Sequence, residues 1–325
     1  MKKLRVIYWA RLQLAKQQIH AALSAVEGAE LVVTEKLPDC LAALKGADAL
    51  ILYDAPPDQA RPLVEALSAP GNTVRWMHFL TAGREGFDAC GLPPKVTVTW
   101  PAGCVAPTVA EHAMALLLAL VRRVPSMLEH QARRHWSRID VSARATSVEG
   151  RTMAIVGYGQ IGRELARRAR PFGIRTVAVS RTPKLDEPLD EAHPLTELDK
   201  VLARADIVAI ALPLTRATHH LFDRRRLALC KPGVILINVA RGGLVDQQAL
   251  ADSLASGQVG AAGLDVVDPE PLPADDPLWD APNLLLSPHF GGGASAVSQA
   301  RLAAGAADNL RRLLAGQPLQ HIVTG

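Results

Sequence analysis

Short apolar runs alternate with helical patterns along the first hundred residues of the chain. The apolar runs predict five strands: Leu4–Trp9, Leu31–Thr34, Ala49–Tyr53, Arg75–Phe79 and Val96–Thr99. Helix-like segments stand between them, around residues 12–26, 40–45 and 58–68. Such alternation is typical of a parallel sheet with helices on both faces. We therefore predict a small flavodoxin-like domain in this part of the chain.

A long apolar helix is predicted next, from Thr108 to Arg123, because Pro107 precedes it and Pro125 follows it. A helix that is apolar on most of its faces is buried between layers or domains. Residues 126–149 are polar and rich in arginine, with one tryptophan, Trp136. We interpret this stretch as an arm or loop that provides an oligomer contact.

The same alternation returns, more sharply drawn, after residue 150. Six apolar runs predict the strands Thr152–Val156, Arg175–Ser180, Ile207–Leu212, Val234–Val239, Ala261–Asp265 and Leu284–Ser287. Near-continuous runs of this kind suit strands that are buried on both faces, and six of them fit a dinucleotide-binding sheet. A last helix, Ala294–Leu314, is expected to fold back on the first domain.

The fold prediction is thus an α/β protein with two doubly wound parallel-sheet domains. The smaller, flavodoxin-like domain is expected to comprise residues 1–105 and about 295–325 and to bind the substrate. Residues 106–294 are expected to form a Rossmann domain that binds NAD(P). A length of 325 residues exceeds a single core, which agrees with two domains.

Composition narrows the class of protein. Hydrophobic residues make up 49% and charged residues 21%, a composition typical of globular proteins. The net charge of +4 is spread along the chain and forms no basic stripe of the kind that binds nucleic acid. The longest basic run, Arg224–Arg226, reads as a solvated helix start. The strongest apolar stretch, Ala113–Val121, is far shorter than the ~20 residues that cross a bilayer.

The same considerations predict a cytoplasmic location. The apolar run near the N-terminus is too short for a signal peptide. The cysteines at positions 40, 90, 104 and 230 have neither metal-ligand nor redox spacing, so we expect reduced thiols and no metal site.

A glycine-rich loop provides the first chemical motif. Gly157-Tyr158-Gly159-Gln160-Ile161-Gly162 has the pattern G-x-G-x-x-G. It follows an apolar strand and opens a helical pattern, which is the context that dinucleotide binding requires. The first glycine allows a tight turn, the second lets the backbone approach a pyrophosphate, and the third lets helix and strand pack closely. The phosphates would then lie at the helix N-terminus.

The residue after the next strand bears on the choice of cofactor. NAD-specific sites usually have an acidic residue there, which accepts a hydrogen bond from the ribose 2′-hydroxyl. Here the position holds Arg181, flanked by Ser180 and Thr182. A guanidinium cannot accept that bond but can pair with a 2′-phosphate, so we predict NADP(H) as the preferred cofactor. NAD(H) stays possible if Arg181 stacks on the adenine instead. Asp186 and Glu187 stand too far beyond the strand to replace the missing acid.

Three later strands each lead to a polar residue that is suited to catalysis. Arg241, Glu270 and His289 follow the fourth, fifth and sixth strands predicted after residue 150. In open parallel sheets, ligands bind beyond the carboxyl ends of the strands, so the three should converge near Gly157. Arginine offers a planar fork to a carboxylate, histidine can donate a proton near neutral pH, and a carboxylate beside it would orient the imidazole.

The other histidines are given structural interpretations. His112 lies in the long helix and is read as structural, and His219 and His220 are read as a helix start. His78 ends a strand near a glycine loop, so both a core position and a position facing a cleft are open for it.

At these residues the chain resembles the D-isomer-specific 2-hydroxyacid dehydrogenases, in the branch of the glyoxylate and hydroxypyruvate reductases. The matching segments lie in the family's order between about residues 75 and 293: Thr81-Ala82-Gly83, Val109–His112, the glycine loop, Leu212–Thr215, Asn238–Gly243, Leu264–Val266, Glu270–Pro273 and Ser287–His289.

The resemblance implies a role for each matching residue. Arg241 would hold the substrate carboxylate and carbonyl, His289 would be the acid/base, and Glu270 would be its partner. Backbone amides at Ala82 and Gly83 would contact the carboxylate of a small 2-oxo acid. The resemblance also implies a homodimer formed through the larger domain. The residues implied to contact the cofactor are Asp265 at the carboxamide, Thr108 near the nicotinamide, and Leu212, Pro213, Val239 and Ala240 along its length.

Departures from the family pattern fall near the substrate side. They are Arg84–Asp88 after the Thr-Ala-Gly segment, Pro101-Ala102 before Gly103, and Tyr53-Asp54. They leave the identity of the substrate open. Since the sequence ends at residue 325, we expect no counterpart of the regulatory domain of many phosphoglycerate dehydrogenases. Glu270 disfavours a formate dehydrogenase, because that branch has glutamine there.

A second hypothesis of a different class stays open. Transcriptional corepressors that sense dinucleotides share this fold, and fold by itself does not fix function. The intact trio favours the enzyme, and turnover on a panel of 2-oxo acids would separate the two hypotheses.

Overall fold

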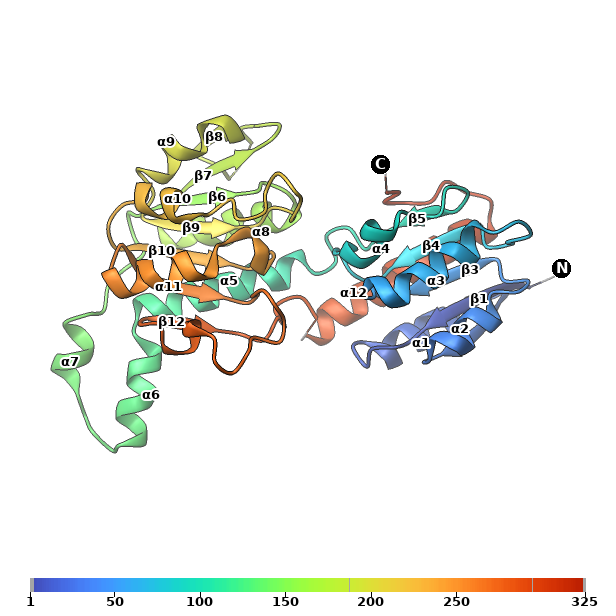
Figure 1. Ribbon diagram of the computed structural model, residues 1–325, viewed down its shortest axis with the longest axis horizontal. Helices are drawn as coiled ribbons and strands as arrows, with labels where there is room; N and C mark the ends of the chain where they lie inside the picture. The colour runs from blue at the N-terminus through green and yellow to red at the C-terminus, as the bar shows by residue number, and fades with distance from the viewer. Residues whose placement is uncertain (1–2, 187, 294, 324–325) are drawn as a thin grey trace. The chain divides into compact units, whose positions relative to one another are not determined.

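The computed structural model describes residues 3–186, 188–293 and 295–323. It separates into two compact units, residues 1–105 with 293–325 and residues 106–292, called here the smaller and the larger unit (Figure 1). Two sequence predictions, the role of Glu187 and the helix start at Ala294, lie outside the described residues.

The smaller unit is built on a parallel sheet. Its described strands are β1 (Leu4–Trp9), β2 (Ala29–Thr34), β3 (Ala49–Leu52), β4 (Trp76–Phe79) and β5 (Thr97–Thr99). They pair in the order β2-β1-β3-β4-β5, and each of these pairs is parallel. This is the flavodoxin-like order, so the predicted fold class of this part of the chain is confirmed.

Helices cover both faces of this sheet. The elements α1 (Lys16–Ser24) and α12 (Ala296–Leu314) pack together on one face, where residues such as Ile19 and Leu310 are fully buried. The other face carries α2 (Leu37–Ala43), α3 (Pro57–Ser68) and α4 (Glu85–Cys90). The last helix therefore returns to the first domain, as predicted, whereas α4 was not predicted from the sequence.

The larger unit contains a second parallel sheet with one more strand, among the described residues, than the six predicted. Its order is β12-β11-β10-β9-β6-β7-β8, and each of these neighbouring pairs is parallel. The strands are β6 (Thr152–Val156), β7 (Arg175–Ser180), β8 (Glu191–Pro194), β9 (Ile207–Ile210), β10 (Val234–Asn238), β11 (Val259–Leu264) and β12 (Leu284–Leu286). The chain order reverses between β6 and β9, as in Rossmann sheets.

The unpredicted strand β8 lies at the edge of the larger sheet. Its sequence, Glu-Ala-His-Pro, has no apolar run, and all four residues are only half-buried. Its side chains form charged contacts instead: Glu191 pairs with Arg175 and Arg204, and the His193 ring lies 2.8 Å from Glu191. An edge strand needs no apolar outer face and tolerates a proline, so the hydrophobic pattern did not show it.

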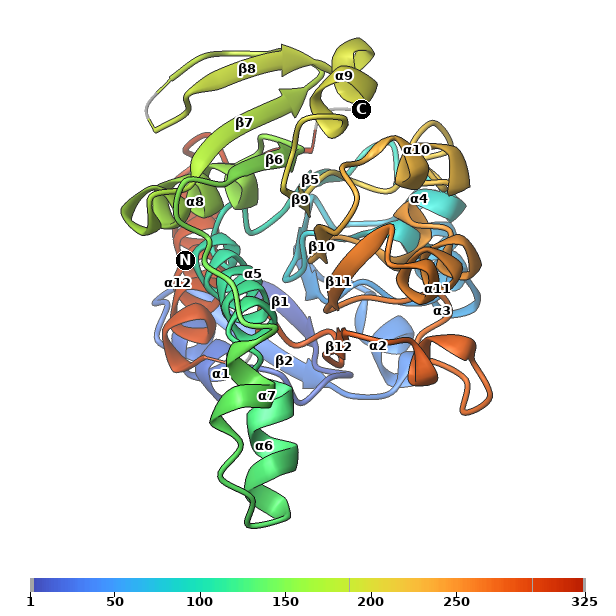
Figure 2. The ribbon, with the colours of Figure 1, turned by 90° about the vertical axis from the view of Figure 1, so that its left-hand side faces the viewer.

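Two layers of helices enclose the larger sheet (Figure 2). On one face lie α5 (Ala106–Val121) and α8 (Gln160–Ala169), and on the other lie α9 (Leu198–Leu202), α10 (Arg224–Leu229) and α11 (Gln247–Ser256). The predicted apolar helix is thus confirmed as α5, and the predicted helix start at Arg224 is confirmed as α10. Within the described chain, no helix combines the length and apolar character of a membrane span.

The segment after α5 is not simply a loop, as the sequence had suggested. It forms α6 (Val124–Ala132) and α7 (Arg138–Ser142), which project from the larger unit (Figure 1). Pro125 stands in the first turn of α6, where the missing N–H costs nothing, so it begins a helix rather than ending one. We call residues 124–143 the arm. Neither arm helix contains a buried residue, and the Trp136 side chain is 94% exposed.

Candidate functional site

The carboxyl ends of the strands in the larger sheet form one row. Val156 aligns with Ile210, Ile210 with Asn238, Asn238 with Leu264, and Leu264 with Leu286. Each of these residues ends its strand, and a predicted site segment follows each one within a few positions. Parallel register therefore brings Gly157, Leu212, Arg241, Asp265 and His289 to the same edge of one sheet.

The glycine loop after β6 is shaped by close backbone contacts. Gly157 has a φ of +104°, and a Cβ there would lie 2.5 Å from the Ala211 backbone. A Cβ on Gly162 would lie 2.3 Å from the Gly157 carbonyl oxygen. These two positions require glycine because neighbouring backbone fills the space that a side chain would occupy.

Gly159 differs from Gly157 and Gly162, because a Cβ on Gly159 would meet no described atom within 4 Å. Gly159 is also the N-cap of α8, and no side chain caps that helix end. Its first N–H groups are left for a ligand, and their partial positive charge favours an anion. The open space, the uncapped helix and the glycine fit the pyrophosphate of a dinucleotide.

Other residues predicted to line the cofactor follow two neighbouring strands: Leu212 and Pro213 come after β9, and Val239 and Ala240 come after β10. Leu212, Val239 and Ala240 are buried, whereas Pro213 is exposed. Tyr158 in the glycine loop stacks against the Arg163 guanidinium, which lies 4.6 Å from the ring centroid. Thr108 lies in the first turn of α5.

Arg181 directly follows β7 and is exposed. The strands β6 and β7 are neighbours, and the Gly157 N–H donates to the Val179 carbonyl at 2.8 Å, so the end of β7 lies beside the glycine loop. The nearby Asp186 carboxylate accepts from Arg163 on α8 at 2.6 Å, and this hydrogen bond lowers the pKa of Asp186. Asp186 is therefore engaged by α8 and not by the end of β7.

His289 and Glu270 form a hydrogen-bonded pair, with 2.7 Å between His289 Nδ1 and Glu270 Oε2. This bond raises the pKa of His289, and burial opposes the shift. Burial also disfavours the charged Glu270, but the bond and charge of His289, the Val267 amide and the charge of Arg241 outweigh it and lower the pKa of Glu270. The pair is therefore biased toward a protonated imidazole beside a carboxylate.

Arg241 is carried by a braced turn after β10. The Asn238 side chain donates to the Arg241 carbonyl at 2.8 Å and accepts from the Ala240 N–H at 3.1 Å. The next residue, Gly242, packs so closely that a Cβ would lie 2.0 Å from the Val267 carbonyl carbon. The turn that bears Arg241 therefore rests on the segment leading to Glu270, and the charge of Arg241 influences the pKa values of both Glu270 and His289.

Asp265 lies beneath the loop that carries His289. It is 3% exposed, and its carboxylate accepts from the Ser287 hydroxyl and, at 3.1 Å each, from the amides of Phe290 and Gly291. These donors lower the pKa of Asp265 against the effect of burial, with His112 the largest of them. Asp265 thus holds residues 287–291 to the end of β11. His289 stands in this loop with a φ of +51°, a backbone conformation that side chains rarely adopt.

Sequence reasoning missed the residues that support the site. Asn238, Ser287 and His112 hold the backbone around Arg241 and His289, but none was assigned this part. One of these residues could have been found from the sequence. Asn238 is a polar residue that ends an otherwise apolar strand, Val-Ile-Leu-Ile-Asn. Buried polar groups of this kind need a partner.

Two interpretations of other histidines are decided by the structure. His78 is a core residue, since it is 1% exposed, its Nδ1 lies 2.8 Å from the Thr99 hydroxyl, and burial lowers its pKa to about 3. The prediction that His219 and His220 begin a helix is wrong. Their rings stack at 3.9 Å in a turn, and α10 begins later because Asp223 caps it by accepting from the Arg226 N–H.

In the smaller unit, the predicted substrate contacts Ala82 and Gly83 follow β4 in a braced turn. The Thr81 hydroxyl donates to the Gly83 carbonyl at 2.9 Å and accepts from the Asp54 N–H at 3.2 Å. The Asp54 carboxylate accepts from the amides of Gly86 and Phe87, which begin α4. Asp54 therefore connects the end of β3 to this turn and to α4.

Two of the three departures from the family pattern, Tyr53-Asp54 and Arg84–Asp88, contribute residues to this network. Arg11 donates to the Asp54 carbonyl oxygen from the end of β1, and Arg84 lies 3.4 Å from the Asp88 carboxylate. Burial raises the pKa of Asp54, and its hydrogen bonds with the α4 amides oppose that shift. The carboxyl edge of the smaller sheet is thus held by charged groups and backbone amides.

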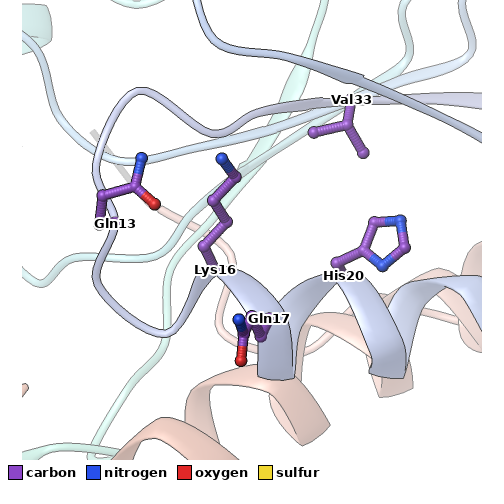
Figure 3. A pocket seen from close by; sticks show the side chains of 5 residues that line it. All are labelled: Gln13, Lys16, Gln17, His20 and Val33. Carbon is purple, nitrogen blue, oxygen red and sulfur yellow. The ribbon is translucent and has the colours of Figure 1, made fainter.

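A shallow depression elsewhere in the smaller unit belongs to neither edge network. It is lined by Gln13, Lys16, Gln17 and His20, on and before α1, and by Val33 of β2 (Figure 3). Lys16 pairs with Glu35, and the depression contains none of the predicted site residues.

Comparison with known proteins identifies the larger unit. Residues 114–291 match the NAD binding domain of the D-isomer specific 2-hydroxyacid dehydrogenases. This match covers the glycine loop, Arg241, Glu270 and His289. The larger unit is thus similar to a domain that binds a nicotinamide dinucleotide.

Relatives and solved structures extend the similarity to the whole chain. Glyoxylate/hydroxypyruvate reductase B of Yersinia pestis is 34% identical over 311 residues, which are 94% of this chain and 91% of that protein. D-3-phosphoglycerate dehydrogenase of Mycobacterium bovis is 36% identical over 277 residues, 85% of this chain, which spans only about half (51%) of that longer protein. A D-isomer specific 2-hydroxyacid dehydrogenase family protein from Aeromonas salmonicida has a TM-score of 0.84 at 30% identity, covering 100% of this chain and 99% of its own.

Proposed function

Because the chain belongs to the D-isomer specific 2-hydroxyacid dehydrogenase family, we propose that it reduces small 2-oxo acids, of the glyoxylate or hydroxypyruvate class, with NADPH as the preferred cofactor. The observation that carries this proposal is the 2.7 Å hydrogen bond between His289 and Glu270, on a sheet edge that also bears Arg241 and the glycine loop.

The residues of the pair suit reduction of a ketone. When bound, the reduced nicotinamide supplies the hydride. Hydride addition leaves negative charge on the carbonyl oxygen, and His289, kept protonated by Glu270, would donate the proton to that oxygen. Arg241 would hold the substrate carboxylate, since a guanidinium pairs with a carboxylate through two parallel hydrogen bonds. The family resemblance assigns the amides of Ala82 and Gly83, in the smaller unit, to binding of the substrate.

The cofactor would lie along the carboxyl edge of the larger sheet. Gly157, Gly159 and the first turn of α8 would hold the pyrophosphate, with Tyr158, Gln160 and Ile161 around it. Asp265 would meet the nicotinamide carboxamide. The remaining length of the cofactor would be lined by Thr108, Leu212, Pro213, Val239 and Ala240.

The preference for NADPH rests on Arg181. This exposed cation directly follows β7, where an NAD-specific site would have an acidic residue. Ser180 and Thr182 would add hydroxyl donors to a 2′-phosphate, while Asp186 stays paired with Arg163.

Steady-state assays on a panel of 2-oxo acids, with NADPH and with NADH, test the proposal directly. We expect turnover with higher kcat/KM for NADPH. Arg181→Asp should shift the preference toward NADH by about tenfold or more, since one charge-assisted contact to a phosphate is worth on the order of 1.5–3 kcal/mol. Arg167→Asp, an exposed change on α8, is the matched control. An unchanged cofactor ratio in Arg181→Asp would remove the phosphate role.

A dinucleotide-sensing protein without turnover is the competing function. Tight binding of NADPH with no turnover on any member of the panel would favour it. The pairing of His289 with Glu270 favours the enzyme, because sensing a dinucleotide requires no proton donor at this position.

We also propose a homodimer formed through the arm. Large apolar side chains are exposed there, with Trp136 at 94%, Ile139 at 80% and Leu128 at 59%. Exposed apolar residues gathered on a projecting segment mark a protein interface, and a second copy of the chain suits them. Trp136→Ser with Ile139→Ser should convert the dimer to a monomer in sedimentation equilibrium, whereas Phe172→Ser outside the arm should not. A wild-type monomer at micromolar concentration would refute the dimer.

A further inference from the structure

His112 is a polar residue in the apolar helix α5. Its side chain is 14% exposed, and its immediate neighbours on the buried face include Val109, Ala113 and Leu116. A histidine among such residues needs a hydrogen-bond partner, because an unpaired buried polar group costs on the order of 1–3 kcal/mol. The partners of His112 are unlike those of a core histidine, since they belong to the loop that carries His289.

The contacts of His112 reach three parts of that loop network. Its Nε2 lies 2.8 Å from the Ser287 hydroxyl and 3.3 Å from Asp265 Oδ1. Its ring lies against Phe290, with 4.7 Å between the ring centroids. Since the Ser287 hydroxyl donates to Asp265, the Nε2–H of His112 is the donor that completes the set, and this assignment fixes the tautomer.

The loop between Ser287 and Gly291 is thereby held at both ends. Ser287 is fixed by Asp265 and His112, and the amides of Phe290 and Gly291 donate to Asp265. A Cβ on Gly291 would lie 2.8 Å from the Asp265 carboxylate and 3.0 Å from the His112 ring, so the backbone is pressed against both side chains. His289 stands between these two fixed points in a left-handed conformation that the loop must impose.

We propose that His112 is a positioning residue for His289: its Nε2–H orients Asp265 and Ser287, and through them it holds the loop in the geometry that places the His289 imidazole against Glu270. The inference rests on the proposed function for its kinetic consequences. Its structural part concerns the His289–Glu270 pair itself, which a titration reads without turnover.

Packing by itself does not account for this residue. A leucine or phenylalanine at this position of α5 would fill the space without a donor that needs a partner. Either residue would also leave the Asp265 carboxylate with one donor fewer. The charged groups that face His289 are Glu270, Arg241 and Asp265. A change at His112 therefore reaches His289 through the position of the loop and the orientation of Asp265.

Two substitutions separate the donor from the ring. His112→Phe keeps an aromatic ring against Phe290 but removes the donor, and His112→Gln keeps an amide donor near the Nε2 position. We expect His112→Phe to lower kcat about tenfold with little change in the KM for NADPH, on the scale of one lost charge-assisted hydrogen bond. His112→Gln should recover most of that loss. His20→Gln, at an exposed position on α1, is the control and should match the wild type.

A second measurement does not depend on turnover. NMR titration of the His289 imidazole should give a pKa in His112→Phe that has fallen toward the ordinary histidine value, because a loosened loop weakens the bond to Glu270. His112→Gln should keep the raised value. An unchanged His289 pKa in a folded His112→Phe protein would overturn the proposal, and so would an unchanged kcat in an active enzyme.

The two proposals fail in different ways. Absence of turnover in the wild-type protein on every 2-oxo acid would refute the proposed reaction but leave the titration able to decide the role of His112. A His112→Phe protein that loses thermal stability while keeping the wild-type His289 pKa would assign His112 a structural role only. Should His112→Phe not fold, the smaller change Ser287→Ala removes the same link and is read out by the same titration.

Discussion

The carboxyl edges of the two sheets are built differently. In the larger unit, side chains bind one another across neighbouring loops: His289 with Glu270, and Asp265 with Ser287 and His112. In the smaller unit, the turn at Ala82 and Gly83 is held by a hydroxyl and by Asp54, and what it presents is backbone. Ionised side chains suit proton transfer, whereas backbone amides suit binding. Under the proposed function, we therefore expect changes at the larger edge to alter the reaction and changes at the smaller edge to alter substrate binding.

Burial raises the pKa of a carboxyl group at each edge, but the net shifts of the two groups are opposite. Glu270 has a lowered pKa, because His289, Val267 and Arg241 outweigh its burial. Asp54 has a raised pKa, because burial outweighs its hydrogen bonds with the α4 amides. The larger edge therefore stabilises charge at the pair, while the smaller edge disfavours it at Asp54.

The largest effect is expected at His289 itself. His289→Asn removes the proton donor and should lower kcat by roughly 10²–10⁴, the usual loss for an acid/base group. The measurement is steady-state kinetics with NADPH and glyoxylate, with the thermal unfolding midpoint recorded in parallel. Near-normal turnover would show that the larger edge does not supply the acid.

Glu270, the hydrogen-bond partner of His289, should set the pH dependence of kcat. Because Glu270 raises the pKa of His289, the protonated donor is present below that raised pKa, and reduction is lost as the pH rises through it. In Glu270→Gln the raising charge is gone, so the alkaline limb of the kcat profile should move to lower pH. The control is Glu164→Gln on α8. An alkaline limb that stays in place would assign it to another group.

A smaller effect is expected at the edge of the smaller sheet. Asp54→Ala removes the acceptor for the Gly86 and Phe87 amides, so α4 is held less firmly beside the turn bearing Ala82 and Gly83, while the bond from the Asp54 N–H to Thr81 remains. We expect the KM for the 2-oxo acid to rise about threefold to tenfold, on the scale of one hydrogen bond, with kcat nearly unchanged. Asp88→Ala, on the exposed side of α4, is the matched control. A fall in kcat with unchanged KM would contradict the division between the two edges.

The hydrophobic pattern predicted most of the strands because buried strands require near-continuous apolar runs. It found β6, β7, β9, β10, β11 and β12 within a few residues of their ends. It did not find β8, a half-buried edge strand with no apolar run, whose Glu191 pairs with Arg175 and Arg204. Nor did it find the arm helices, which have no buried face to leave a pattern in the sequence.

The candidate site divides in the same way. The sequence by itself determined the elements and the chemistry: two parallel sheets, a glycine loop that follows a strand, and an arginine, a glutamate and a histidine that follow later strands. Those features are local, because strand propensity, turn geometry and residue type are read over a few positions. The resemblance to a family added a role for each residue.

Only the tertiary structure decided which groups touch. The pairing of His289 with Glu270, the brace from Asn238 to Arg241, and the network of His112, Asp265 and Ser287 join residues up to 175 positions apart. Separation along the chain carries no information about such contacts. Strand order and register create the contacts between loops, because they place the ends of β11 and β12 side by side, and hydrogen bonds between the segments that follow then fix each side chain.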